Sequence, residues 1–308
     1  MDLSVIIVNY NTRQLLTECL ASVSAETTGI EYEVIVVDNH SSDGSREMLE
    51  RDAPLVKKIF NTENRGFAAA NNQALGIASG KYVLLLNSDT NILKNAIGTS
   101  LDFMQKHTEA SILGCRLLNA DGTLQRSCRS FPSVWNIFSE SLFLYKMFPR
   151  TTLFGSYYMT HFDHDTVRQV DVVMGAFMMI HREVFERVGL LDESYFMYTE
   201  ETDFCYRAAV QGFHAYFIPS AEVIHYGGGS IESSEKHVAQ LHSTQVFYLR
   251  KHFTGFRKYA AIGLKLTGVA LRVPVYALAW AFTLDSLWLE KSRWYAKALG
   301  KAFYSKNH

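Results

Sequence analysis

The sequence predicts an α/β fold: a mixed, mainly parallel sheet flanked by helices, with a helical appendage at the C-terminal end. Over residues 1–90, apolar strand-like runs alternate with stretches of helical periodicity, joined by short connections, which is the pattern of βαβ units. The run Tyr82–Leu86 is apolar or aromatic throughout, as in a strand buried on both faces in the middle of a parallel sheet. Several runs end abruptly in polar residues. The carboxyl ends of parallel strands share one edge, where open α/β sheets bind ligands, so we expect a ligand site there.

The first two strands are predicted at Leu3–Val8 and Tyr32–Val37. Each is followed by a polar turn and then by helical periodicity, and Asn11 or Thr12 is expected to cap the first helix. Polar residues follow both strands at the same edge of the sheet: Asn9, Asn11, Asp38 and Asn39.

A third strand, Val56–Phe60, leads into a polar turn that ends in Arg65 and Gly66. The helix that follows is rich in alanine, and small side chains allow a helix to pack closely on a sheet. An arginine beside a glycine at a helix start suits an anion, although a solvated arginine in a loop has the same pattern.

The central strand, Tyr82–Leu86, ends in Asn87, Ser88 and Asp89. It therefore delivers a carboxylate to the edge of the sheet, where an acidic turn can hold a divalent cation against the phosphates of a nucleotide. The structural alternative is that Asp89 caps the following turn.

Beyond the central strand the regular alternation breaks. We expect a helix over Ala96–His107, a strand over Ile112–Leu117 and a hairpin turn at Asn119–Gly122. Residues 130–162 are rich in aromatic side chains and show little periodicity. This segment is either core or an apolar surface for a lipid-bearing substrate.

Three carboxylates, Glu200, Glu201 and Asp203, follow an aromatic stretch and precede a helical pattern. Carboxylates in a first turn favour the helix dipole, which accounts for one or two of them. Three acids in an apolar setting also point to a catalytic base, because such a setting raises the basicity of a carboxylate. Upstream, a strand over Val170–Met179 allows close backbone approach at Gly175.

His225 follows an apolar pair and precedes three glycines and a serine. A histidine after an apolar pair is commonly a packed core residue. In this glycine-rich stretch it could also join Asp89 on a metal.

Together these blocks resemble the family 2 glycosyltransferases of the GT-A fold, in the bacterial rhamnosyltransferase-like branch. The resemblance covers residues 3–230 and consists of ordered motifs at consistent separations. The early blocks are Ser4–Asn11, Val37–Asn39 with Ser41–Ser45, Asn64–Ala68 with Asn71, and Leu86–Asp89. The later blocks are Gly175-Ala176, Gly189 with Asp192-Glu193, Glu200–Asp203, and His225 before Gly228 and Ser230.

The resemblance implies that the first half of the sheet binds the donor nucleotide. Asp38 would then face the base or ribose, and Arg65 would approach the diphosphate. The residues implied in donor binding are Asn9, Asn11, Asp38, Asn39, Arg65, Gly66, Asn87 and Ser88.

The resemblance also implies a cofactor, Mg²⁺ or Mn²⁺. Asp89 looks like the last acid of the family's DxD motif, and His225 like its later metal ligand. The first position of the motif is Asn87 rather than Asp. Asparagine can orient sugar or water but is a poorer metal ligand, so metal affinity would rest on Asp89, His225 and the diphosphate.

The activity implied is transfer of a sugar from a nucleoside-diphosphate donor, such as dTDP-rhamnose, to a hydroxyl of a glycan or polyprenol-linked acceptor in bacterial cell-surface polysaccharide synthesis. The mechanism implied is a single displacement with inversion. Glu201, or alternatively Glu200, would take the proton of the acceptor hydroxyl. Asp203 would orient the acceptor or stabilise the helix start.

The resemblance divides the chain into a GT-A domain, residues 1–230, and a C-terminal helical region, residues 231–308. Residues 1–90 would form the nucleotide-binding half of the domain and residues 91–230 the acceptor half. A dinucleotide-dependent oxidoreductase should show G-x-G-x-x-G after the first strand, and the stretch Asn9–Thr12 has no glycine. A nucleotidyltransferase, and a non-catalytic nucleotide-sugar or carbohydrate-binding protein, are the alternatives.

The composition predicts a reducing compartment. The four cysteines fall in four separate segments without metal-type pairing, which predicts free thiols. The N-terminus begins directly with a strand rather than with a signal-peptide pattern, so we expect the body of the protein in the cytoplasm. No nucleic-acid partner is predicted.

The C-terminal region is basic: residues 250–308 carry 11 Lys or Arg against 2 acidic residues. Lys265 and Arg272 share one side of a predicted helix, which Pro274 is expected to break or kink. The longest uncharged stretch there, Val273–Leu284, has 12 residues, short of the roughly 20 needed to span a bilayer. Interleaved aromatic and basic residues predict peripheral contact with the inner leaflet of an anionic membrane. Packing on the catalytic domain or in a homo-oligomer is the alternative.

Overall fold

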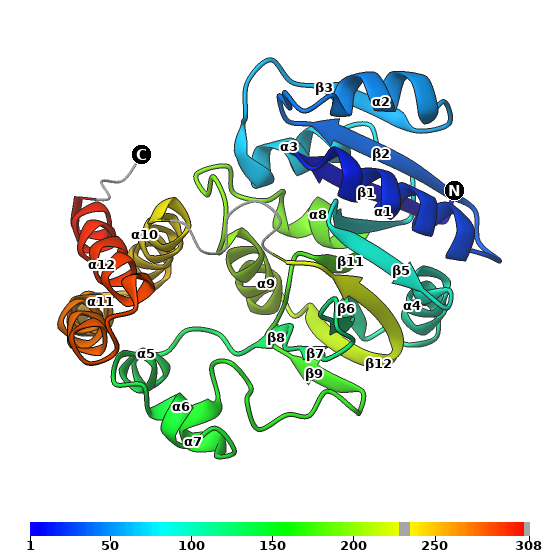
Figure 1. Ribbon diagram of the computed structural model, residues 1–308. Helices are drawn as coiled ribbons and strands as arrows, with labels where there is room; N and C mark the ends of the chain where they lie inside the picture. Colours follow the sequence, from blue (N-terminus) through cyan, green and yellow to red (C-terminus); the bar gives the residue numbers. More distant parts are fainter. Residues whose placement is uncertain (228–234, 305–308) are drawn as a thin grey trace. The chain divides into compact units, whose positions relative to one another are not determined.

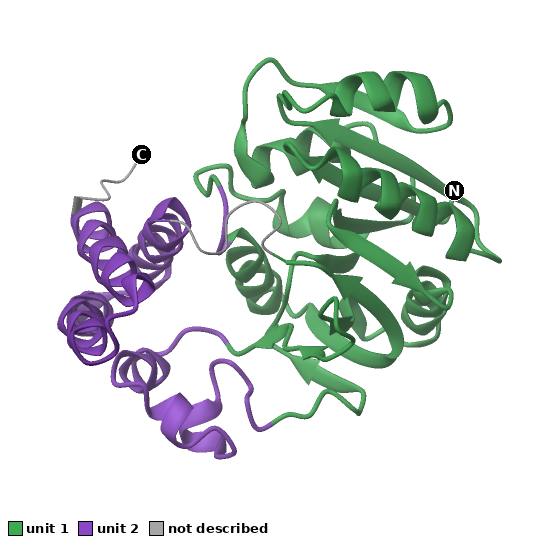
Figure 2. Ribbon diagram, in the orientation of Figure 1, with its two compact units in different colours: residues 1–130, 162–196, 200–230 green, residues 131–161, 197–199, 231–308 purple. Residues whose placement is uncertain are grey.

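The computed structural model describes residues 1–227 and 235–304, and the chain forms two compact units (Figures 1 and 2). Among the described residues, the sheet unit comprises residues 1–130, 162–196 and 200–227. The helical unit comprises residues 131–161, 197–199 and 235–304. The aromatic segment that follows residue 130 therefore belongs largely with the C-terminal helices.

The first half of the sheet is parallel, as predicted. Strands β1 (Leu3–Asn9), β2 (Tyr32–Asp38), β3 (Lys57–Phe60) and β4 (Tyr82–Asn87) lie in the order β3-β2-β1-β4. The register pairs Asn9 with Asp38 and Val8 with Asn87, so the polar strand ends meet at one edge. Strand β4 is buried along its apolar length because it lies between β1 and β11.

The helices of this half follow the strands in turn: α1 (Arg13–Glu26), α2 (Ser45–Asp52) and α3 (Gly66–Leu75). The alanines of α3 are buried, as close helix packing requires. Thr12 takes the N-cap position of α1, but its hydroxyl makes no cap hydrogen bond. Asp43 accepts from the Arg13 backbone N–H at 2.7 Å instead. All four cysteines are buried and free, as predicted.

The second half makes the sheet mixed. Its elements are β5 (Thr90–Leu93), α4 (Ala96–Lys106), β6 (Ala110–Leu118), β7 (Leu124–Gln125), β8 (Cys128–Arg129), β9 (Arg168–Val170), β10 (Val172–Val173), β11 (Phe177–His181), α8 (Arg182–Val188), α9 (Glu200–Val210) and β12 (His214–His225). Strand β11 runs antiparallel to β4, and β12 pairs with both β6 and β5.

The prediction of one continuous strand over Val170–Met179 was wrong. The chain there forms three strands: β9 pairs with β12, β10 pairs with β8, and β11 pairs with both β4 and β6.

The helical unit contains α5 (Val134–Ser141), α6 (Leu144–Met147), α7 (Thr152–Gly155), α10 (Glu235–His252), α11 (Gly255–Thr283) and α12 (Ser286–Tyr304). Ala239, Val269 and Ala298 form its small core between α10, α11 and α12. A side chain at Gly268 would collide with Ser141, so this glycine allows α11 to approach α5 closely. Of the two outcomes expected at Pro274, a break or a kink, the break does not occur, since α11 continues through Pro274 to Thr283.

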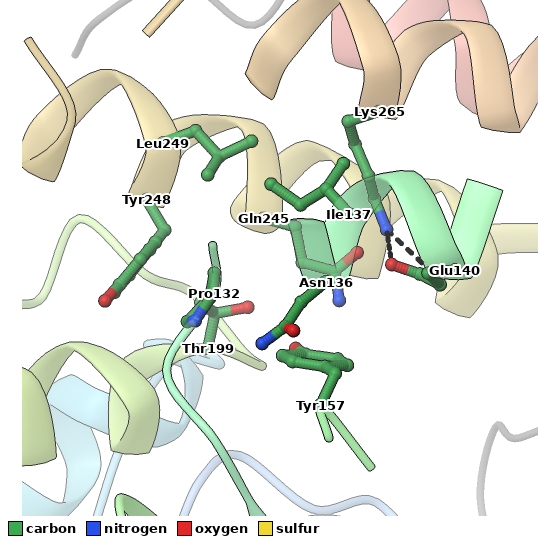
Figure 3. A pocket seen from close by; sticks show the side chains of 10 residues that line it. All are labelled: Pro132, Asn136, Ile137, Glu140, Tyr157, Thr199, Gln245, Tyr248, Leu249 and Lys265. Carbon is green, nitrogen blue, oxygen red and sulfur yellow. Dashed lines mark hydrogen bonds and ion pairs between the residues drawn. The ribbon is translucent and has the colours of Figure 1, made fainter. Parts of the chain in front are cut away.

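Lys265 and Arg272 do share one face of α11, but that face is buried. The Lys265 Nζ atom lies 2.9 Å from both carboxylate oxygens of Glu140 on α5 (Figure 3). Arg272 donates to the Glu140 carbonyl at 3.1 Å and stacks over the Phe143 ring. The expectation that these two cations face a membrane was therefore wrong, because a buried acid on α5 attracts both of them.

Helix α11 is long and apolar enough to cross a membrane by length and composition. It alone meets that test among residues 1–227 and 235–304, and 28% of its most apolar window is buried. The expectation that this region does not span a bilayer therefore stays a prediction. Length and composition are weak evidence for a membrane span, since core helices of other proteins share them.

Candidate active site

Asp89 and His225 meet at the polar edge of the sheet. The His225 Nε2 atom lies 3.3 Å from Asp89 Oδ1, and their side chains are 10% and 16% exposed, respectively. Strand β12 places the histidine, because His225 pairs with Thr90 and the next backbone N–H, of Tyr226, donates to the Asp89 carbonyl at 2.9 Å. Two residues far apart in sequence thus form one polar pair.

Gln125 on β7 orients the His225 ring. The Gln125 amide nitrogen donates to the Asn119 side-chain oxygen at 3.0 Å and to the His225 carbonyl at 3.3 Å. Its Oε1 atom is therefore left to accept the Nδ1–H of His225 at 2.6 Å. The neutral ring then carries its lone pair on Nε2, the atom that faces Asp89 and lies 3.3 Å from Asn87 Nδ2. The sequence analysis did not predict Gln125 as a site residue. The hairpin turn predicted just before β7 was the feature of the sequence that could have indicated it.

This donor set fits a divalent cation. A carboxylate oxygen and an imidazole nitrogen suit Mn²⁺, and a hydrogen bond to the far ring nitrogen is the usual support of a ligating histidine. Among the described residues, no group of three or more His, Cys, Asp or Glu side chains gathers as a complete ligand set. One or two protein ligands with substrate phosphates is the arrangement expected for Mg²⁺ at a nucleotide site. Gly228 and Ser230, quoted with His225 above, lie outside the described residues.

The ends of β1 and β2 form a buried polar network. The Asn9 amide donates to Asp38 Oδ1 at 2.9 Å and to Ser41 Oγ at 3.0 Å. The Ser41 backbone N–H donates to Asp38 Oδ2 at 3.1 Å, and its hydroxyl accepts from the Asn11 backbone. Thr12 bridges this network to Ser88, with 2.9 Å between the hydroxyl oxygens. Ser41 and Thr12 were not predicted as site residues. The runs of polar residues that follow both strands could have indicated them.

The turn before α3 is held by a different set of contacts. Asn39 Oδ1 accepts from the Arg65 backbone N–H at 3.1 Å. Gly66 has a φ of +81° and packs so closely on the Phe196 carbonyl that a side chain there would collide with it. The Arg65 guanidinium is 40% exposed and lies 3.8 Å from Glu193. An exposed ion pair of this kind is weak, so the guanidinium is free to turn toward a phosphate.

Gly175 lies beside the central strand. The backbone N–H of Asn87 donates to the Ala176 carbonyl at 3.1 Å. A side chain at Gly175 would reach only the Phe67 ring, at ordinary contact distance. No close protein neighbour among the described residues therefore requires glycine at this position.

The three acids lie in the first turn of α9, which packs on β10. Glu200 is buried, its Oε2 atom has no hydrogen-bond partner, and burial together with the neighbouring Glu201 charge raises its pKa well above the ordinary value. Glu201 is partly exposed. Asp203 is fully buried and accepts from Arg207 Nε at 2.7 Å and from the Tyr195 hydroxyl at 3.4 Å. These contacts favour a role for Asp203 in stabilising the start of the helix over a role in orienting the acceptor.

The raised pKa of Glu200 predicts a pH-dependent cost in stability. A carboxyl whose folded pKa exceeds its unfolded pKa binds its proton more tightly when folded. Stability therefore falls as pH rises from the ordinary glutamate pKa through the raised one. We expect Glu200→Gln to raise the thermal midpoint at pH 8 and to leave it unchanged near pH 4, as measured by circular dichroism. An equal effect at both pH values would contradict this explanation.

The comparisons with known proteins agree with this architecture. The family model "Glycosyl transferase family 2" matches residues 4–189. The N-acetylglucosaminyl-diphospho-decaprenol L-rhamnosyltransferase of Mycobacterium tuberculosis is 28% identical over 263 residues, which cover 81% of this chain and 85% of that protein. Rhamnosyltransferase WbbL of Escherichia coli K12 is 26% identical over 270 residues, covering 84% and 97%.

Among solved structures, the mannosyltransferase PcManGT of Pyrobaculum calidifontis, in complex with GDP-Man and Mn²⁺, superposes with a TM-score of 0.60. It is 18% identical, and the match covers 99% of this chain and 88% of that one, so it supports the GT-A fold. The predicted fold class is thereby confirmed. Since the family model spans more than half of the chain, the protein belongs to glycosyltransferase family 2.

Proposed function

We propose that the protein transfers a sugar from a nucleoside-diphosphate donor to a hydroxyl of a lipid-linked glycan acceptor, with inversion. The observation that carries the proposal is the pairing of Asp89 with an oriented His225 at the polar edge of the sheet. The rhamnosyltransferases among its relatives support a donor such as dTDP-rhamnose, and the decaprenol in one printed name supports a polyprenol-linked acceptor.

In this proposal Asp89 and His225 hold Mg²⁺ or Mn²⁺. When bound, the cation would neutralise charge on the leaving nucleoside diphosphate. Gln125 keeps the Nε2 lone pair of His225 directed toward Asp89, and Asn87 orients the donor beside this pair. The structure of PcManGT with GDP-Man and Mn²⁺ supports this cofactor class.

Residues 1–90 act as the nucleotide-binding half of the sheet unit. The Asn9–Asp38 pair faces the nucleoside, with Asn11, Asn39 and Ser88 around it. The rigid turn at Gly66 presents Arg65 to the diphosphate. The proposed acceptor half covers residues 91–230, of which residues 131–161 and 197–199 fold with the helical unit.

Glu201 is the proposed base. It accepts the proton of the acceptor hydroxyl as that oxygen attacks the anomeric carbon, while the bond from that carbon to the diphosphate oxygen breaks. Glu200 is less suited, because burial raises the pKa of its carboxyl well above the ordinary value and so disfavours the charged form.

The decisive test is a transfer assay with the full chain. Purified protein is incubated with dTDP-, UDP- and GDP-sugars, Mn²⁺ and a short polyprenyl-diphosphate sugar. Release of nucleoside diphosphate together with extension of the acceptor by one sugar supports the proposal. Binding of nucleotide sugars without turnover of any donor would favour a non-catalytic binding protein. Formation of a new nucleotide sugar with pyrophosphate would favour a nucleotidyltransferase.

The helical unit supports a peripheral location on the cytoplasmic leaflet. Where α11 ends and α12 begins, six large apolar side chains are exposed, which we call the apolar tip: Val275, Leu278, Trp280, Phe282, Leu284 and Leu287. Basic side chains follow them on α12, where Arg293 is exposed and Lys291 is half-buried. Apolar anchors with nearby cations suit an anionic membrane surface.

We expect the full-length protein to float with anionic vesicles at low salt, and Phe282→Asp with Leu284→Asp to abolish flotation. Phe256→Asp is the matched control, because Phe256 is equally exposed at the opposite end of α11. Carbonate extraction should release the bound protein. Resistance to carbonate would favour a membrane-spanning α11, and failure to float would favour protein packing. Deleting the chain after Phe253 is a poorer test, since it removes part of the helical core.

A further inference from the structure

The aromatic segment that follows residue 130 exposes large apolar side chains within the helical unit. Residues 131–161 belong to that unit and form α5, α6 and α7 (Figure 2). Five exposed apolar side chains of this segment make up what we call the α5–α7 patch: Trp135, Leu142, Met147, Phe148 and Leu153. Met147 is 65% exposed and Leu153 is 56% exposed. A contiguous apolar surface marks a place where a soluble domain meets another body.

Hydrogen bonds and ring contacts hold the patch together. The Trp135 indole N–H donates to the Leu153 carbonyl at 2.7 Å. The Phe154 ring centroid lies 5.8 Å from that of Trp135 and 5.3 Å from that of Phe148. The Thr151 hydroxyl donates to the Phe148 carbonyl at 3.0 Å. The exposed apolar side chains are therefore presented by a folded frame and lie next to one another.

The exposed charge of this segment is positive. Lys146 and Arg150 lie on either side of Met147 and Phe148 in the sequence, and both are exposed. Residues 141–162 contain no aspartate or glutamate, and Glu140, just before them, is buried. Such a surface attracts an anionic partner. Tryptophan and lysine or arginine beside exposed apolar side chains is the composition of protein surfaces that lie in the headgroup layer of a bilayer.

The patch adjoins the part of α11 that leads into the apolar tip. A side chain at Gly268 would collide with Ser141, so the end of α5 lies against α11. The Arg272 guanidinium lies 4.6 Å from the centre of the Phe143 ring, at the start of α6. Val275, the first residue of the apolar tip, follows Arg272 within one helical turn. The two apolar surfaces therefore belong to one unit and neighbour the same contact.

We propose that the α5–α7 patch is a second membrane-docking site, which enters the headgroup layer of an anionic bilayer beside the apolar tip. Met147, Phe148 and Leu153 supply the apolar contact. Lys146 and Arg150 pair with lipid phosphates. Two linked docking sites bind more tightly than either alone and fix the orientation of the helical unit on the surface, which one site leaves free to rotate. The proposal rests on the peripheral membrane location proposed above.

The first test is flotation with vesicles of phosphatidylglycerol and phosphatidylcholine at low salt. Met147→Asp with Leu153→Asp should lower the partition coefficient at least about tenfold, because charged side chains replace two apolar contacts. Leu55→Asp with Val210→Asp is the matched control. It places the same two charges at exposed apolar positions of the sheet unit and should bind as wild type. An equal loss in both double variants would overturn the inference.

The second test concerns the two cations. Lys146→Gln with Arg150→Gln should weaken binding to the anionic vesicles several-fold and leave binding to pure phosphatidylcholine vesicles unchanged. Lys94→Gln with Lys106→Gln removes the same charge from the sheet unit, where these side chains are 84% and 70% exposed, and should have little effect. If the two pairs weakened binding equally, net charge alone would explain it and the assigned lipid contacts would be wrong.

A third measurement reports the contact directly. The native cysteines are buried, so a polarity-sensitive fluorophore can be attached selectively to Met147→Cys. We expect its emission to increase and shift to the blue on adding anionic vesicles, and a nitroxide carried by the lipid to quench it. The same label at Leu55→Cys, on the sheet unit, should not respond. Because a label at an exposed position disturbs the fold little, this test stands even if the aspartate variants fold poorly.

The outcomes separate this inference from the proposals on which it rests. An unresponsive label at Met147 on protein that floats would overturn the patch and leave the apolar tip as the docking site. Failure of the wild-type protein to float would overturn the membrane location and the patch together. A response that needs no vesicles and grows with protein concentration would overturn the patch in favour of a contact between two copies. Absence of sugar transfer by the wild-type protein would overturn the proposed function and leave the docking result standing.

Discussion

Replacing Asp89 with alanine is expected to abolish the metal-dependent part of nucleotide binding while leaving the fold intact. Asp89 contributes the carboxylate that faces the lone pair of His225 Nε2. Loss of even an outer partner of a metal ligand costs about 10–100-fold in metal affinity, so loss of a direct ligand should cost at least as much. Calorimetry with dTDP, UDP and GDP, with and without Mn²⁺, measures the effect as the gain in affinity on adding metal.

Two further variants are compared with Asp89→Ala. Asp102→Ala removes an exposed acid on α4 whose ion pair with Lys106 is a surface pair, so it should keep wild-type binding. Gln125→Ala leaves both proposed ligands in place but frees the His225 ring, and should give an intermediate loss. Unchanged metal dependence in Asp89→Ala would show that the cation is held elsewhere.

Replacing Glu201 with glutamine is expected to reduce turnover by roughly 10²-fold or more with donor binding retained. The amide keeps the size of the side chain and cannot accept a proton. The same change at Glu200 should cost less turnover, because burial raises the pKa of the Glu200 carboxyl and so disfavours the charged form that a base needs. Steady-state kinetics of both variants, with donor affinity measured by calorimetry, make the comparison. A dead Glu200→Gln beside an active Glu201→Gln would reverse the assignment of the base.

Local sequence pattern determined the first half of the sheet. An apolar run such as Tyr82–Leu86 is buried wherever it folds, and the polar residues that end such runs must lie at the carboxyl edge of a parallel sheet. The pairing of Asn9 with Asp38 and the location of Asn87 followed from this rule. The contact between Asp89 and His225 was reached through resemblance to a family, because no local pattern joins residues so far apart.

Only the tertiary structure determines which residues the polar side chains contact through hydrogen bonds and ion pairs. Gln125 meets His225 across 100 residues, and Glu140 meets Lys265 across 125. The periodicity of a helix gives the face on which Lys265 and Arg272 lie, but it carries no information on whether that face meets solvent, membrane or a buried acid. The sequence therefore predicted a basic surface where the fold has an internal ion pair.

Periodicity and composition thus determined the sheet and its polar edge, because burial and strand direction act over a few residues. The orientation of His225 and the burial of Lys265 depend on contacts between distant segments, which exist only once the chain has folded.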